Sequence, residues 1–162
     1  MSRNFAIAFG VGLAIIALAV GGVLWMQRGS AIDFEARILK ARIAPLDENS
    51  TVAVLDFRLS NPSNLILEVR RVEVEMVDAS GAHITGDVIS EGDTNRVFEA
   101  VPVLGTKYLP NLSMRQRITP HSTADYMTAA RIPVPLAQVE ARARFVLRIE
   151  EVDGKSFDFM ER

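Results

Sequence analysis

An uninterrupted apolar stretch at residues 5–26 constrains this chain more than any other feature of its sequence. The stretch reads FAIAFGVGLAIIALAVGGVLWM and holds 22 residues without a charged side chain. A helix of that length is ~33 Å long, which is enough to cross the hydrocarbon core of a bilayer. The sequence therefore predicts a single N-terminal transmembrane helix, with a tail at residues 1–4 before it and a linker at residues 27–33 after it.

A cleaved signal peptide is the alternative interpretation of this stretch. Signal peptides have a shorter apolar core and end at small residues. Here the small pair Gly29 and Ala31 lies beyond Arg28, and Trp25 stands where an interfacial aromatic residue is expected, so we favour a retained anchor. A count of Lys and Arg alone favours an orientation with the C-terminal domain in the cytoplasm. Folded domains are, however, exported regardless of charge. We expect a protein of the inner cell membrane with a periplasmic, or otherwise extracytoplasmic, C-terminal domain.

Small residues recur at four-residue spacing within the apolar stretch. Such rows let two membrane helices approach closely, although Ala and Gly are also common in membrane helices for no specific reason. No ionisable residue interrupts the stretch, so it does not resemble an ion or proton path. The candidate helix-packing residues are Ala6, Gly10, Ala14, Ala17 and Gly21.

The rest of the chain, residues 34–162, has the size of one domain. The only two basic residues of the first 30 positions are arginines, so residues 31–162 carry 16 basic and 20 acidic residues and a formal charge of −4. This mild acidity argues against a nucleic-acid partner, which requires a clustered basic face. Cysteine is absent, which excludes disulfides, thiolate metal sites and a catalytic thiol.

Alternating apolar and polar residues predict about seven short antiparallel strands, and hence a mainly β sandwich domain. In the clearest strand, residues 51–60, one face carries Ala53, Leu55, Phe57 and Leu59, and the other face carries the polar residues Asp56, Arg58 and Ser60. A change of phase predicts irregularities within residues 34–43 and at Arg70-Arg71. The expected strands cover residues 34–43, 51–60, 65–78, 83–90, 124–134, 142–152 and 156–159.

Residues 91–114 interrupt this pattern as an irregular apolar insertion. Two interpretations remain open: the insertion folds back as a lid on its own domain, or it forms an interface with a partner. The candidate interface residues are Val97, Phe98, Val101, Leu104, Tyr108 and Leu109.

The sequence also resembles the LEA-2 family (late embryogenesis abundant, related to the WHy domain). The resemblance rests on Phe57-Arg58-Leu59-Ser60-Asn61-Pro62, the long alternating strand and glycine turn that follow, and the Thr-Pro-x-Ser loop at residues 119–122. It covers about residues 34–159 and implies an immunoglobulin- or fibronectin-III-like sandwich behind a membrane helix. The family implies no catalytic residues.

The sequence contains no recognisable catalytic, cofactor-binding or metal-binding motif. His83 and His121 lack a second ligand at a suitable spacing, and no nucleophile elbow or phosphate-binding loop follows a strand. An arginine row on one strand is expected to pair with Glu73 or Glu75, with an anionic contact as the alternative. That row is Arg142, Arg144 and Arg148.

These features together predict a non-enzymatic, single-pass membrane protein without cofactor or small-molecule substrate. Its expected partners are the lipid bilayer and other integral membrane subunits, and its expected role is that of an accessory subunit of a larger complex, such as a respiratory or photosynthetic one. The alternatives are a free-standing LEA-2-like protein for envelope stress protection or lipid binding, and a carrier whose sandwich opens into a cavity.

Overall fold

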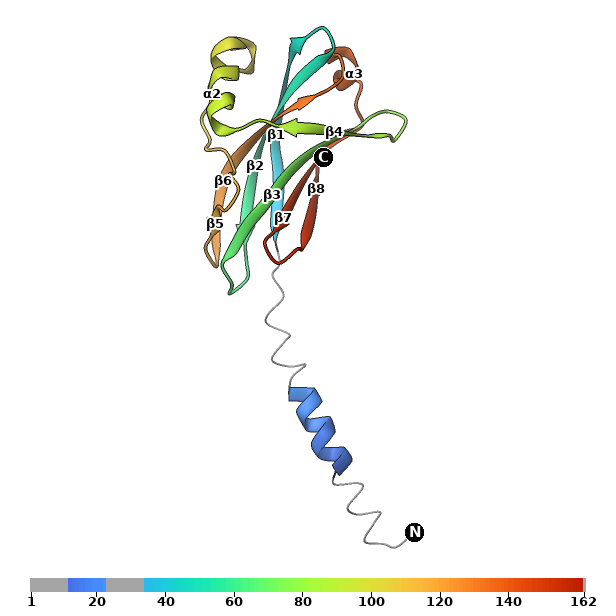
Figure 1. Ribbon diagram of the computed structural model, residues 1–162, viewed down its shortest axis with the longest axis vertical. Helices are drawn as coiled ribbons and strands as arrows, with labels where there is room; N and C mark the ends of the chain where they lie inside the picture. The colour runs from blue at the N-terminus through green and yellow to red at the C-terminus, as the bar shows by residue number, and fades with distance from the viewer. Residues whose placement is uncertain (1–11, 23–33, 162) are drawn as a thin grey trace, which may run out of the picture.

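Eight antiparallel strands form the domain, which is accordingly mainly β (Figure 1). The computed structural model describes residues 12–22 and 34–161. The strands are β1 (Glu35–Asp47), β2 (Ser50–Asn61), β3 (Leu67–Val77), β4 (His83–Val88), β5 (Arg117–Ile118), β6 (Ser122–Ile132), β7 (Arg144–Glu151) and β8 (Ser156–Met160). The helical elements of the domain are α2 (Glu91–Ala100), the 3-10 turn η1 (Pro102–Leu104) and α3 (Leu136–Glu140).

The strands follow the order β1-β2-β6-β4-β3-β7-β8, and β5 pairs with β3. One layer contains β1, β2 and β6, and the other contains β3, β7 and β8. Strand β4 joins the layers, because residues 83–86 pair with β3 whereas residues 87–88 pair with β6. The ladder therefore curls on itself as a sandwich.

Both irregularities predicted from the sequence are confirmed. The register of β1 against β2 shifts between Ile38 and Lys40, where the apolar phase changes. The register of β3 against β7 shifts between Val69 and Arg71, at the Arg70-Arg71 pair. A turn at Asp153-Gly154 joins β7 to β8, with Gly154 at a φ of 87°.

The main core lies between the two layers. The predicted inward residues of β2, which include Phe57, are fully buried against β3 and β7 residues such as Met76 and Leu147. Tyr126 packs beside this core, with its ring centroid 6.4 Å from that of Phe57.

The opposite face of β2 is exposed at Arg58 and covered toward the start of the strand. Val52, Val54 and Asp56 on this face are buried, because α2 and η1 fold over it. Helix α2 begins after Ser90, whose Oγ accepts a hydrogen bond from the Asp93 backbone N–H.

Residues 12–22 form a helix whose side chains are exposed in the isolated chain. Within the described parts of the chain, no helix is both long and apolar enough to cross a membrane. The predicted span at residues 5–26 extends past this helix at both ends, and residues 5–11 and 23–26 lie outside the described residues. The transmembrane helix therefore stays a prediction. Ala6 and Gly10 also lie outside the described residues, whereas Ala14, Ala17 and Gly21 lie on the described helix.

Candidate binding site

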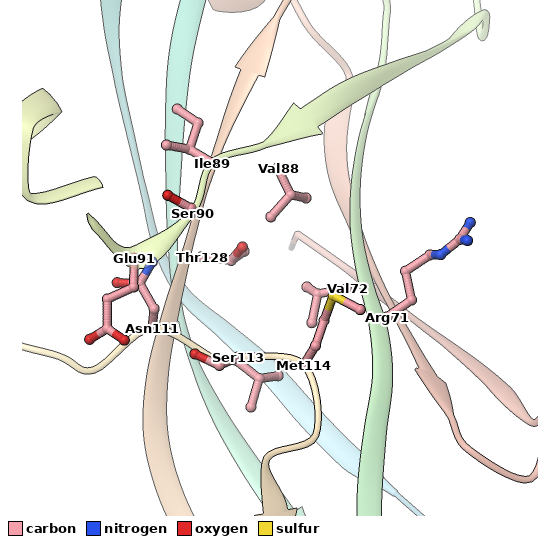
Figure 2. Close-up of a pocket in the computed structure, with 11 residues that line it drawn as sticks. Arg71, Val72, Val88, Ile89, Ser90, Glu91, Asn111, Ser113, Met114 and Thr128 are labelled. Carbon is pink, nitrogen blue, oxygen red and sulfur yellow. The ribbon is translucent and has the colours of Figure 1, made fainter. Parts of the chain in front are cut away.

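A side pocket of about 500 Å³ opens where β4 passes from one layer to the other (Figure 2). Both ends of the 91–114 insertion contribute to it, together with β3, β4 and β6. Its lining residues include Arg71, Val72, Val88, Glu91, Asn111 and Met114.

The crossing of β4 explains why the sandwich is open here. Strand β3 pairs with β4 only at residues 74–77 and with β5 only at residues 67–68. The pocket lies against Arg71 and Val72, between these two pairings. The crossing itself requires Gly86, because a Cβ at that position would lie 2.5 Å from Ile132 Cδ1.

The pocket lining combines apolar and polar side chains, and Arg71 lies beside Val72 (Figure 2). Val72 and Met114 lie on one side, and Ser90, Glu91 and Asn111 lie on the other, near the start of α2 (Figure 2). This separation suits a ligand or peptide segment that has both an apolar part and a hydrogen-bonding group.

The polar side contains a buried acceptor that lacks a partner. Asn111 Nδ2 donates to Thr94 Oγ1 at 3.0 Å, and Thr94 Oγ1 donates to the Ser90 carbonyl at 2.8 Å. Asn111 Oδ1 is buried and accepts no hydrogen bond from the described residues. A buried acceptor of this kind costs about 1–3 kcal/mol when it is unpaired.

The six candidate interface residues of the insertion mostly cover the domain itself. Leu104 is 2% exposed, and Val97, Phe98, Val101 and Leu109 are partly buried against the outer face of β2 and β6. Only Tyr108, which is 68% exposed, lies largely free on the surface. The insertion thus acts as a lid over the outer face of one layer, and its role as an interface stays a prediction for its exposed part.

A buried ion pair fastens this lid, and sequence reasoning missed it. Arg42 Nη2 lies 2.8 Å from Asp56 Oδ1, and both side chains are less than a tenth exposed. Arg42 Nη1 donates to the carbonyls of Leu104 and Thr106 at 2.9 and 3.1 Å. The guanidinium carbon lies 5.0 Å from the ring centroid of Phe98. One feature of the sequence could have indicated this buried pair: the apolar residues Val52 and Val54 share a strand face with Asp56.

The arginine row is largely neutralised by carboxylates. Arg148 lies 2.7 Å from Asp158 and 3.1 Å from Glu75, as the pairing hypothesis predicted for Glu75. The hydrogen bond to Asp158, followed by the charges of Asp158 and Glu75, raises the pKa of Arg148. Arg142 lies 2.7 Å from Glu161, whereas Arg144 is exposed. A contact of this row with an anion stays a prediction.

Both histidine side chains are exposed, and each has one hydrogen-bond partner. His83 Nδ1 lies 2.9 Å from Glu75, and His121 Nε2 lies 2.8 Å from Asn64 Oδ1. Among residues 12–22 and 34–161, no group of three or more His, Asp or Glu side chains is placed to hold a metal ion. The expectation that the protein is not an enzyme stays a prediction.

Glu151 is a buried carboxyl group whose Oε2 has no hydrogen-bond partner within the described domain. Burial, and secondarily the charge of Asp153, raise its pKa. Protonation therefore stabilises the fold below the pKa of the unfolded chain, and this contribution is lost as the pH rises through the folded-state pKa.

We expect Glu151→Gln to increase the free energy of unfolding by about 1 kcal/mol at pH 7, because it removes a buried charge. The gain should fall toward zero near pH 4, where the carboxyl group is protonated. Urea unfolding at both pH values measures this difference. Glu150→Gln is the control, since Glu150 forms an exposed pair with Arg70 at 3.1 Å and should give no gain. An equal gain from both variants would contradict the role of burial.

No protein-family model matches this sequence, and no curated protein matches it. Similar solved structures include the ApaA protein from Bordetella pertussis, at 12% identity over 81% of this chain and 89% of that chain, with a TM-score of 0.40. An uncharacterised β-sandwich protein from Clostridium difficile 630 is 16% identical over 82% of each chain, with a TM-score of 0.31. The Iho670 flagellar-like filament is 10% identical over 96% of this chain and 97% of that chain, with a TM-score of 0.39. These scores and identities are too low to assign a function to this chain.

Proposed function

We propose that this chain is a non-enzymatic, single-pass membrane protein whose β-sandwich serves as an accessory subunit of a larger membrane assembly. The apolar stretch at residues 5–26 would anchor it, and its row of small residues would pack against another helix. The domain would then contact a neighbouring integral membrane subunit through the side pocket.

The main support for this proposal is the exposure of apolar side chains at the opening of the pocket. Met114 is 72% exposed and Val88 is 42% exposed, and both line the pocket together with Asn111. Exposed apolar residues next to a concave site favour a protein or ligand contact over free solvent. An apolar side chain of a partner would fill the pocket between Val88 and Met114.

Met114→Glu and Val88→Glu are expected to reduce co-purification of the partner by at least about tenfold, because a charge would replace an apolar contact at the pocket mouth. The measurement compares the yield of co-purified membrane proteins per tagged chain in mild detergent. Met160→Glu is a matched control, since Met160 is 56% exposed on β8, and it should leave the yield unchanged. Yields that fall equally in the control, or in none of the variants, would contradict the proposed contact.

Lipid or small-molecule binding is the second candidate function. A volume of about 500 Å³ lies in the range typical of small-ligand pockets. This function would agree with the LEA-2-like alternative, in which the protein binds lipid or protects the envelope. Recovery of a lipid from the purified chain, in place of a protein partner, would favour it.

A further inference from the structure

Three exposed aliphatic side chains lie together at one end of the sandwich, away from the side pocket. Leu65 and Ile66, in the loop between β2 and β3, are 42% and 56% exposed. Val152, in the turn between β7 and β8, is 51% exposed. The Val152 backbone N–H donates to the Glu68 carbonyl at 3.1 Å, which brings the two loops together. We call Leu65, Ile66 and Val152 the apolar rim.

The chain enters the domain at this same end. Glu35 at the start of β1 pairs with Ser60 at the end of β2, directly before the loop that carries Leu65. Phe34 packs against Phe157 at the start of β8, with ring centroids 5.1 Å apart. The start of β1 and the loops of the rim therefore share the lower end of the domain in Figure 1.

Buried hydrogen bonds hold the rim loops in place. Asn61 Nδ2 donates to the Leu65 carbonyl at 2.8 Å and to the Ile118 carbonyl at 3.1 Å. His121, in the next turn, lies 2.8 Å from Asn64. The exposure of Leu65 and Ile66 is thus a property of a fixed loop.

Arginines pair with three of the acidic groups near this end, although Glu151 and Asp153 beside Val152 have no arginine partner among the described residues. Arg58 lies 2.7 Å from Asp125, and Arg70 lies 3.1 Å from Glu150. Arg117 lies 3.1 Å from Glu68. This pairing partly offsets the mildly acidic charge of the domain where the rim is exposed, and so reduces repulsion from a negatively charged lipid surface.

We propose that the apolar rim inserts into the interfacial region of the bilayer and fixes the tilt of the domain on the membrane. This inference rests on the proposed anchoring by residues 5–26. The linker at residues 27–33 reaches at most ~25 Å when fully extended. A tether this short raises the effective concentration of the rim at the lipid surface, so weak insertion by three side chains suffices.

Fluorescent labelling tests the insertion directly, and the absence of native cysteine makes single-site labels specific. The variants Ile66→Cys and Val152→Cys would carry the environment-sensitive dye NBD, in the full chain reconstituted into phosphatidylcholine–phosphatidylglycerol vesicles. They lie in different loops, so one remains informative if the other variant fails to fold. Leu46→Cys is the matched control, since Leu46 is 40% exposed near the other end of β1.

We expect a blue-shifted emission at the rim positions and quenching by doxyl-labelled lipid at least about twofold stronger than at Leu46. If the chain floats with the vesicles but the rim labels show the same emission and quenching as the label at Leu46, this inference is overturned and the anchoring stands. A blue shift without lipid quenching would indicate a protein contact and would also overturn it. A chain that does not float with the vesicles would instead refute the anchoring itself, and the inference with it.

Discussion

Replacement of Phe57 by alanine is expected to lower the free energy of unfolding by about 3–5 kcal/mol. Phe57 is fully buried at the centre of β2, between the two layers. Its partners belong to β-strands that cannot close the gap, because β2 is held by β1 on one side and β6 on the other. The cost therefore includes both the lost apolar burial and the cavity that remains.

Chemical denaturation of the domain measures this loss. Phe159→Ala is the matched control, because Phe159 on the edge strand β8 is only partly buried and should cost clearly less. A Phe57→Ala loss no larger than that of Phe159→Ala would mean that the inward face of β2 is assigned wrongly.

Removal of the Asp56 carboxylate is expected to have an effect of similar size. Asp56→Ala should cost about 3–5 kcal/mol, because it leaves the buried guanidinium of Arg42 without its counter-ion. The variant should also loosen the lid, since the same guanidinium donates to the carbonyls of Leu104 and Thr106. Unfolding measurements give the first effect, and trypsin cleavage after Lys107 reports the second.

The double variant Arg42→Met with Asp56→Leu separates the ion pair from the lid. Buried ion pairs are often replaceable by apolar residues at little cost, so this variant should be more stable than Asp56→Ala. Its Lys107 site should still be cleaved faster than in the native chain, because the two carbonyl contacts of Arg42 are lost. A double variant as unstable as the single one, with an unchanged cleavage rate, would contradict this account of the network.

Local sequence patterns predict most of this fold because alternation and turn residues act over a few positions. The strand at β2, the two irregularities in β1 and β3, and the Asp153-Gly154 turn are each encoded by neighbouring residues. The immunoglobulin-type classification is finer than these patterns support and stays a prediction.

The candidate site depends on contacts between residues distant in sequence, which alternation does not reveal. Arg42 meets Leu104 across 62 positions, and the pocket joins β3 to the two ends of the insertion. The cover formed by α2 and η1 on the outer face of β2 was not predicted, because the residue pattern of a single strand does not show which elements pack against it. Only the unusual Val52 and Val54 beside Asp56 pointed to a cover.

Isolation of the full chain from its native membrane, with a photo-crosslinker at position 114, tests the central claim most directly. The account predicts a stoichiometric integral membrane partner in mild detergent, crosslinked from position 114 and not from position 160, which is also exposed. A membrane-extracted chain that runs alone, with no crosslinked neighbour at position 114, would contradict it.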